Sequence, residues 1–252
     1  MRTAVVIPTL NEEAAIGGVV RALRANIDRV LVADGGSTDA TAANAREAGA
    51  EVIAAGRGYG RACLVGAAAA QDADIIVFMD GDGADDPASF SALVAPIRDG
   101  RFDFTIASRA RGAREPGSIG AHQLAAGWLA GLAMRALYGV RYTDMCAFRA
   151  IRRDALLGLG MREMTYGWNI EMQMRAARAG LRILEIAVPY RRRAGGESKV
   201  AGSLRGTLRA SARIVATFVR VALQRDASVH PTTPTPDPSP QGGGVKMRER
   251  DA

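Results

Sequence analysis

Four short apolar segments near the start of the chain are each followed by a loop of glycine and polar residues, and this alternation restricts the possible folds. The apolar segments cover 3–7, 29–33, 51–54 and 74–79, and segments with helical spacing lie between them. The pattern predicts an α/β fold, a Rossmann-like, mainly parallel sheet flanked by helices. Because ligands bind beyond the carboxyl ends of parallel strands, one site is predicted from the loops 8–13, 34–39, 56–61 and 80–86.

The second half of the chain is less regular. Strands are predicted at 104–107 and 182–188, and helices at 124–138, 154–159, 167–179 and 202–225. From Ser228 onward proline and glycine dominate, and such a segment cannot form a packed core. The sequence therefore predicts a catalytic or binding domain at 1–201, a basic amphipathic helix at 202–227 and a disordered tail at 228–252.

The charge balance indicates partners that carry phosphate. The 252 residues include 33 Lys and Arg against 26 Asp and Glu, a net charge of +7, and nearly all the cations are arginine. A nucleic acid, a nucleotide and an anionic lipid all fit this balance. Two cysteines, Cys63 and Cys146, exclude a disulfide framework, so a reducing, cytoplasmic compartment is expected.

No signal peptide or membrane-spanning helix is expected. The polar residues Asn11-Glu12-Glu13 come before any apolar signal region could form. The most membrane-like stretch, 124–134, is interrupted by Arg135 and is shorter than the ~20 apolar residues of a spanning helix. The expectation is a soluble or surface-bound protein.

The strongest chemical signal is Asp80-Gly81-Asp82 at the end of an apolar strand. Two carboxylates one residue apart can share a divalent cation, and hard oxygen ligands suit Mg²⁺ or Mn²⁺. Gly81 and Gly83 permit a tight turn and the close approach of a ligand. The alternative is an acidic surface turn, since Asp-Gly pairs are common in turns.

Two further segments indicate recognition of a nucleotide and of phosphate. In Asp34-Gly35-Gly36-Ser37 the carboxylate can accept a hydrogen bond from a base, although the segment would also form a turn and a helix cap. Arginines at 191–193 precede Gly195-Gly196-Glu197-Ser198-Lys199, which is typical of a phosphate clamp on a mobile loop. A solvated basic loop is the alternative there.

Taken in order, these segments resemble family 2 glycosyltransferases of the GT-A fold, and most closely the dolichyl- or polyprenyl-phosphate mannosyl- and glucosyltransferases. The resemblance covers roughly residues 3 to 210. The sequence departs from that branch at two points. Ala84 stands where the branch commonly has a metal-contacting Gln, whose role Asp85 or Asp86 would have to take over. The C-terminal membrane helices of many members are also lacking. The segments that carry it are Val6–Glu13, Ala33–Asp39, Met79–Asp82, Ser108-Arg109, Asp144–Arg149 and Arg193–Lys199.

The resemblance implies transfer of a hexose from a nucleotide-sugar to a phosphate-bearing lipid acceptor, with inversion. It implies Mg²⁺ or Mn²⁺ bound by Asp80 and Asp82, and an acceptor phosphate bound by Arg109 and Arg149. Such an acceptor is already ionised and needs no general base, whereas a hydroxyl acceptor would need one, with Asp144 or Glu171 as candidates. Catalytic roles are implied for Asp82, Arg109, Asp144, Arg193, Ser198 and Lys199, and nucleotide-binding roles for Pro8, Thr9, Asn11, Glu12, Asp34, Gly36, Gly60, Arg61 and Asp80.

The last predicted helix suggests a further partner. Arg205, Arg209 and Arg213 are four residues apart and share a face, which fits an interfacial anchor on anionic lipid at the inner face of the cell membrane. The alternative is a helix packed on the catalytic domain with its arginines in solvent.

Other functional classes are less compatible with the sequence. No nucleic-acid-binding motif occurs, and the aspartates at 80–86 would repel a phosphate backbone. A nucleotidyltransferase would need a glycine-rich loop where Pro8–Glu13 stands. A glycosyltransferase for hydroxyl acceptors and a non-catalytic nucleotide-sugar binder remain as alternatives.

Overall fold

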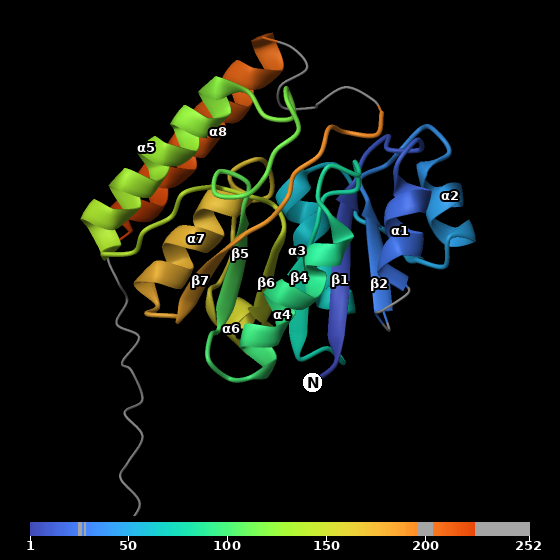
Figure 1. Cartoon of the computed structure of the whole chain (residues 1–252), viewed down its shortest axis with the longest axis horizontal. Coiled ribbons are helices and arrows are strands. Elements are labelled where there is room, and N and C mark those ends of the chain that lie inside the picture. Colours follow the sequence, from blue (N-terminus) through green and yellow to red (C-terminus); the bar gives the residue numbers. More distant parts are fainter. Residues whose placement is uncertain (25–26, 28, 196–203, 225–252) are drawn as a thin grey trace, which may run out of the picture.

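A mixed seven-stranded sheet forms the centre of the structure (Figure 1), and its strand order is β3-β2-β1-β4-β6-β5-β7. The computed structural model describes residues 1–24, 27, 29–195 and 204–224. The strands are β1 (Thr3–Thr9), β2 (Arg29–Asp34), β3 (Glu51–Ala54), β4 (Ile75–Phe78), β5 (Phe104–Ser108), β6 (Arg149–Arg152) and β7 (Ile183–Ala187). The helices are α1 (Ile16–Arg24), α2 (Thr41–Glu47), α3 (Tyr59–Ala69), the short 3₁₀ helix η1 (Pro87–Ser89), α4 (Phe90–Arg98), α5 (Ala121–Tyr138), α6 (Arg153–Gly158), α7 (Trp168–Arg178) and α8 (Leu204–Leu223).

The predicted parallel sheet is confirmed, with one reversed strand that the sequence did not reveal. β1 pairs in parallel with β2 and β4, β2 with β3, and β5 with β7. β6 lies between β4 and β5 and is antiparallel to both. It was missed because its sequence, Arg-Ala-Ile-Arg, offers no apolar run, and α4 was missed as well.

Side chains of the central strands alternate between two cores, one on each face of the sheet. On β1, Ala4 and Val6 contact the core that includes α3 and α7, whereas Val5 and Ile7 contact the core of α1 and α4. A strand covered on both faces reads as a continuous apolar segment, which explains the pattern in the sequence.

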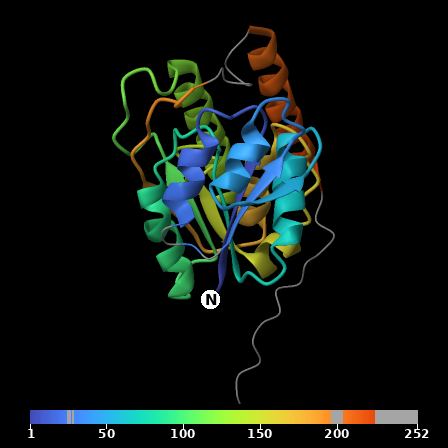
Figure 2. The same cartoon turned by 90° about the vertical axis from the view of Figure 1, so that its right-hand side faces the viewer.

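Helices α5 and α8 stand at the carboxyl end of the β5–β7 half of the sheet (Figures 1 and 2). The predicted helix at 202–225 is present as α8, and it packs on α7. The predicted tail at 228–252 lies outside the described residues. No described helix is both long enough and apolar enough to cross a bilayer.

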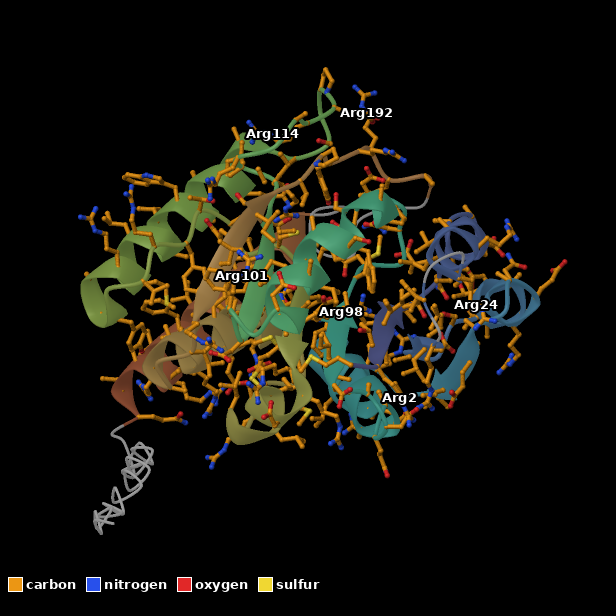
Figure 3. All side chains as sticks on the ribbon, turned by 60° about the horizontal axis from the view of Figure 1, so that its bottom comes forward. Arg2, Arg24, Arg98, Arg101, Arg114 and Arg192 are labelled. Atoms are coloured by element: carbon orange, nitrogen blue, oxygen red, sulfur yellow. The ribbon has the colours of Figure 1, made fainter. Side chains whose placement is uncertain are left out.

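Six arginines lie on separate parts of the periphery of the molecule in Figure 3, and all six are exposed. The labelled residues are Arg2, Arg24, Arg98, Arg101, Arg114 and Arg192.

Candidate active site

The four polar loops named above meet around one cavity of about 740 Å³. Each loop contributes to its wall, through Pro8–Leu10 and Glu12, Gly35, Arg57–Tyr59 and Asp80–Asp82. The opposite wall comes from residues that follow β5 and β7, from the segment 165–170, and from α5 and α8. The carboxyl ends of parallel strands thus position the cavity, as expected for an α/β sheet.

An acidic cluster lies at the end of β4. Loss of hydration and, after it, the neighbouring charge of Asp82 together raise the pKa of the Asp80 carboxyl to about 7. The Tyr59 hydroxyl donates a hydrogen bond to Asp80 Oδ1 over 3.2 Å. Asp85 is buried behind them, where burial and the charges of Asp80 and Asp82 raise its pKa well above the usual value.

Arg193 supplies one positive charge to this cluster. Its Nη1 lies 2.8 Å from Asp82 Oδ2, and its Nη2 donates to Glu12 Oε1 over 2.7 Å. The backbone is tied to the same loop, because the Ala194 N–H donates to the Asp82 carbonyl over 3.0 Å. The segment that follows β7 is therefore fastened directly to the acidic loop.

A second charged pair faces the cavity. Arg109 follows β5, and Asp144 lies in the segment before β6. Arg109 donates to Asp144 through Nε and Nη2, over 2.8 and 2.7 Å, and its backbone N–H adds a third bond of 2.8 Å. Burial raises the pKa of Asp144, but the hydrogen bonds and charge of Arg109 outweigh that effect and lower it. The Arg109 guanidinium also lies 5.0 Å from the ring centre of Tyr190.

A partly buried carboxylate next to this pair holds it in place. Glu185 on β7 accepts hydrogen bonds from the Thr143 N–H over 2.7 Å, the Thr143 hydroxyl over 2.9 Å and the Asp144 N–H over 3.2 Å. The three bonds fix the backbone immediately before the Asp144 side chain, so the orientation of Arg109 depends on Glu185 as well.

Asp80 and Asp82 fit a divalent cation in part. Both carboxylates line the cavity, and hard oxygen donors are the ligands that Mg²⁺ and Mn²⁺ prefer. Among the described residues no group of three acidic, histidine or cysteine side chains could hold a metal alone. Two carboxylates completed by phosphate oxygens remain a common arrangement for Mg²⁺.

Asp85 and Asp86 were considered as replacements for the metal-contacting Gln that is absent at Ala84. Both carboxylates form hydrogen bonds elsewhere in the loop. Asp85 Oδ2 accepts from the Asp80 N–H over 3.4 Å, and Asp86 Oδ1 accepts from the Ala88 N–H over 3.3 Å at the start of η1. Neither is part of the cavity wall. A third protein ligand is therefore not provided by this loop.

The predicted nucleotide-binding residues divide into two groups. Pro8, Thr9, Glu12 and Asp80 line the cavity. The others form its support: the Ser37 hydroxyl donates to Asp34 Oδ1 over 2.6 Å, and the Thr38 N–H donates to Asn11 Oδ1 over 2.9 Å. The first bond fixes the second loop internally and the second bond joins the first two loops, outside the cavity wall. The residues that lie outside it are Asn11, Asp34, Gly36, Gly60 and Arg61.

Gly60 has a packing role that its sequence context did not reveal. A Cβ at this position would collide with the carbonyl oxygen of Glu163. The adjacent Arg61 N–H donates to the Met164 carbonyl over 3.0 Å. Glycine is required here because the 163–164 backbone lies directly against the start of α3.

Two residues with predicted roles are buried in the structure and do not reach the cavity. Arg149 is fully buried and donates to the carbonyls of Cys146 and Asn169, so it does not bind an acceptor phosphate. Glu171 is also fully buried, and it accepts from the Arg175 side chain over 3.0 Å and from the Glu163 N–H over 2.6 Å. It is therefore neither the candidate base nor a residue of the helix surface.

Four of the six residues with predicted catalytic roles lie in the cavity wall. Asp82, Arg109, Asp144 and Arg193 all line the cavity. Ser198 and Lys199 lie outside the described residues. Several wall residues were not named individually in advance. Arg57 and Tyr59 lie in the predicted loop 56–61 and Tyr190 follows β7, so the rule of strand ends covers these three. The others include Gln123, Thr165, Tyr166, Asn169 and Ile214.

Comparisons with known proteins agree with this geometry. Residues 4–160 match the family described as Glycosyl transferase family 2. An uncharacterized glycosyltransferase of Mycobacterium tuberculosis is 38% identical over 212 residues, which cover 81% of this chain and 92% of that protein. The chain belongs to glycosyl transferase family 2. It is accordingly a glycosyltransferase.

Other relatives of this glycosyltransferase have names that state an acceptor. An undecaprenyl-phosphate mannosyltransferase of Micrococcus luteus is 31% identical, over 82% of this chain and 90% of that protein. A dolichyl-phosphate hexose transferase of Haloferax volcanii is 36% identical, over 76% of this chain and 84% of that protein.

A solved structure confirms the GT-A type of fold. Glucosyl-3-phosphoglycerate synthase from Mycobacterium tuberculosis, crystallised with Mn²⁺, UDP-glucose and phosphoglyceric acid, superposes with a TM-score of 0.71 at 24% identity. The match covers 90% of this chain and 81% of that one. At this identity the likeness concerns the fold.

Proposed function

We propose that this glycosyltransferase moves a hexose from a nucleotide-sugar to the phosphate of a polyprenyl- or dolichyl-type lipid, with inversion and with Mg²⁺ or Mn²⁺. The observation that carries the proposal is the distribution of charge in one cavity. Two aspartates, Asp80 and Asp82, lie in the wall beside the nucleotide loops, and two arginines, Arg109 and Arg193, line the same cavity. The curated relatives that act on polyprenyl-type phosphates support this choice of acceptor.

The acidic side of the cavity suits the donor diphosphate. Asp80 and Asp82 would hold the divalent ion, which when bound supplies Lewis-acid stabilisation of the departing nucleoside diphosphate. Arg193 lies beside Asp82 and can turn its guanidinium towards a phosphate oxygen as the donor enters. Ser198 and Lys199 follow it in the chain, and we propose that they complete the phosphate contacts and help to exclude water.

The basic side suits an acceptor that is already an anion. Arg109 presents a guanidinium oriented by Asp144, and a planar guanidinium matches a phosphate monoester well. A phosphate oxygen attacks the anomeric carbon without losing a proton, so no general base is required. This agrees with Asp144, whose pKa is lowered by Arg109 and which is therefore a weak proton acceptor.

The same proposal implies a location for the protein. Both cysteines are free and buried, which agrees with a reducing compartment. We propose that the protein works in the cytoplasm at the inner face of the cell membrane, where a lipid phosphate is presented.

A transfer assay with purified protein tests the proposal. UDP-, GDP-, dTDP- and CDP-sugars are combined with Mn²⁺ or Mg²⁺ and with one of two acceptors, a short-chain polyprenyl phosphate or 3-phosphoglycerate. We expect a lipid-linked sugar phosphate with one donor, lost on addition of EDTA and in Asp82→Asn. Transfer to the hydroxyl of 3-phosphoglycerate and not to the lipid phosphate would overturn it. Tight donor binding without any transfer would instead identify a nucleotide-sugar binder.

A further inference from the structure

Exposed apolar side chains are concentrated on α5 and α8. Of the eleven large apolar side chains that are exposed in the described residues, eight belong to these two helices. The remaining three are scattered as Met1, Leu64 and Leu157. Single exposed apolar residues are ordinary on a protein surface, but a contiguous group marks an interaction site. The eight are Trp128, Leu129, Leu132, Leu137, Leu208, Val215, Val219 and Leu223.

Helix α5 is fixed with its apolar side outward by two glycines. Gly127 and Gly131 are buried against the backbone of 142–144, and a Cβ on Gly131 would collide with the Tyr142 carbonyl oxygen. Positions 129 and 132 lie on the opposite side of the helix, because each residue advances by about 100°. Trp128 on the same side is 64% exposed.

Helix α8 carries apolar side chains on two sides. Val221 is buried and Ile214 and Phe218 pack against the core, whereas Leu208, Val215 and Val219 are exposed. In a helix on the surface of a globular protein the large apolar side chains normally face the core. The outward stripe of α8 therefore does not serve the packing of this domain.

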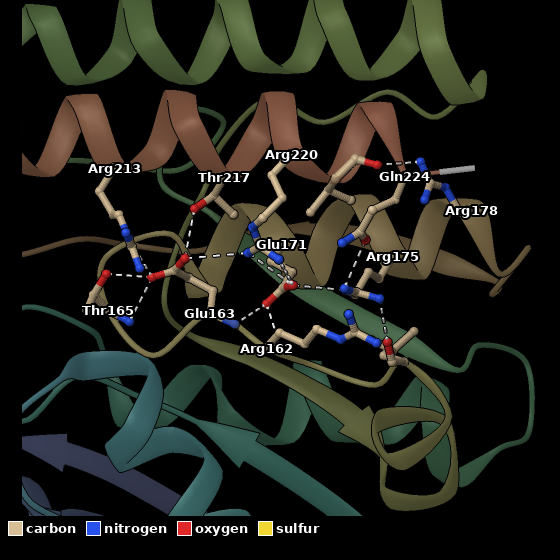
Figure 4. A network of polar contacts seen from close by, with 12 residues as sticks. Arg162, Glu163, Thr165, Glu171, Arg175, Arg178, Arg213, Thr217, Arg220 and Gln224 are labelled. Atoms are coloured by element: carbon tan, nitrogen blue, oxygen red, sulfur yellow. Dashed lines mark hydrogen bonds and ion pairs between the residues drawn. The ribbon is translucent and has the colours of Figure 1, made fainter. Parts of the chain in front are cut away.

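Ion pairs with two buried glutamates hold α8 in this orientation (Figure 4). Arg213 Nε lies 3.1 Å from Glu163 Oε1, and Arg220 Nη2 lies 3.5 Å from Glu163 Oε2 and 3.4 Å from Glu171 Oε1. The Thr217 hydroxyl donates to Glu163 over 3.0 Å. Arg213, which was expected to contact lipid, thus pairs with the body of the protein instead, and an apolar stripe is left facing outward.

The charge of the two helices favours an anionic partner. Their sequences contain five arginines and no aspartate or glutamate. Arg135 on α5 and Arg209 on α8 are exposed beside the apolar residues. Both helices also line the cavity, α5 through Gln123 and α8 through Ile214. A partner that covers the two helices therefore lies next to the site.

We propose that the exposed apolar side chains of α5 and α8 together form a docking surface for an anionic lipid bilayer. The surface inserts Trp128 and the leucines at the level of the headgroups, while the flanking arginines contact lipid phosphates. The biological purpose of this surface rests on the proposed lipid acceptor, which it would bring to the cavity from the bilayer.

Vesicle flotation of the full chain tests this docking without any turnover. We expect the protein to float with phosphatidylcholine vesicles that contain phosphatidylglycerol, and less with phosphatidylcholine alone. The pair Trp128→Gln/Leu132→Gln and the pair Val219→Gln/Leu223→Gln should each lower the partition coefficient by about tenfold or more. The matched control, Leu64→Gln/Leu157→Gln, removes exposed apolar groups elsewhere and should bind as the wild type does.

Intrinsic fluorescence gives a second measurement that needs no variant. The chain has two tryptophans; Trp168 is fully buried, so a blue shift on adding anionic vesicles reports Trp128. Absence of both flotation and shift at low salt overturns the proposal. It is also overturned if the paired variants bind vesicles normally, or if the wild type is a dimer that they dissociate. Because transfer to a short-chain acceptor in solution is measured separately, failure of docking is distinguishable from failure of the proposed function.

Discussion

Arg193 and Asp82 form an ion pair of 2.8 Å at the point where a divalent cation is proposed to bind. The second Nη of Arg193 is held by Glu12 over 2.7 Å, so the guanidinium bridges two carboxylates. A divalent cation held by Asp82 would compete with this guanidinium for the carboxylate. Weakening of the pair would leave the guanidinium available to the donor phosphates.

Removing Arg193 should separate metal binding from catalysis. In Arg193→Ala we expect Mn²⁺ to bind more tightly, by about threefold to tenfold, because a competing positive charge is lost. Transfer should nevertheless fall by ~10² or more, since the donor loses a charged contact. Titration calorimetry with Mn²⁺ and initial rates measure the two effects. The neighbouring exposed Arg192→Ala is the control, and weaker Mn²⁺ binding in Arg193→Ala would contradict the competition.

Asp80 should limit the stability of the metal-free protein at neutral pH. Its carboxyl pKa is raised from 3.8 to about 7 in the folded state. As pH rises from 4 to 7 the unfolded chain loses this proton and the folded chain retains it, so stability declines over that range and then levels off. Asp80→Asn removes the titration and should raise the free energy of unfolding by roughly 2 kcal/mol at pH 8, with little effect at pH 4.

Thermal melts in EDTA at several pH values check this expectation. The variant is expected to be inactive, so its gain in stability and loss of activity occur together. Leu157→Gln, exposed and far from the acidic loop in the sequence, serves as the control and should show no such pH dependence. An equal Tm difference between Asp80→Asn and wild type at pH 4 and pH 8 would contradict the assignment of the raised pKa.

Much of the site could be predicted because it follows one rule of parallel sheets. Asp80 comes after β4, Arg109 after β5 and Arg193 after β7, and each strand is recognisable as an apolar run. The rule fails for Gln123 and Ile214, which reach the cavity from helices. Where a helix lies depends on close contacts such as that of Gly60 with Glu163, which no spacing in the sequence reveals.

Charged residues were the other source of error. Arg149 resembles a free cation in the sequence, but its guanidinium is buried on the carbonyls of Cys146 and Asn169. The Glu171 carboxylate likewise pairs with Arg175 from α7 and Arg220 from α8. Asn169 and Arg220, which complete these contacts, lie 20 and 49 residues away in the sequence, so the sequence gives no sign that these two charges will be buried.

Arg109 and Asp144 should act as one unit in acceptor binding. In Arg109→Lys the bidentate contact is lost, and in Asp144→Asn the guanidinium loses its orienting charge. We expect each variant to raise the KM for the acceptor phosphate about tenfold or more, with a smaller change in the KM for the donor. The double variant should be little worse than either single one, because both disrupt the same contact. Additive losses in the double-mutant cycle would show independent roles.

Glu171→Gln tests whether the buried glutamate has any chemical role. Its carboxylate accepts from Arg175 over 3.0 Å and pairs with Arg220 at 3.4 Å, while the side chain is fully buried. Neutralising it leaves two arginines without full compensation and should lower the free energy of unfolding by about 3 kcal/mol. The rate per folded molecule, with donor and acceptor saturating, should change by less than about tenfold. A loss of ~10³ or more at a temperature where the variant is folded would restore Glu171 as a general base and contradict the base-free transfer to phosphate.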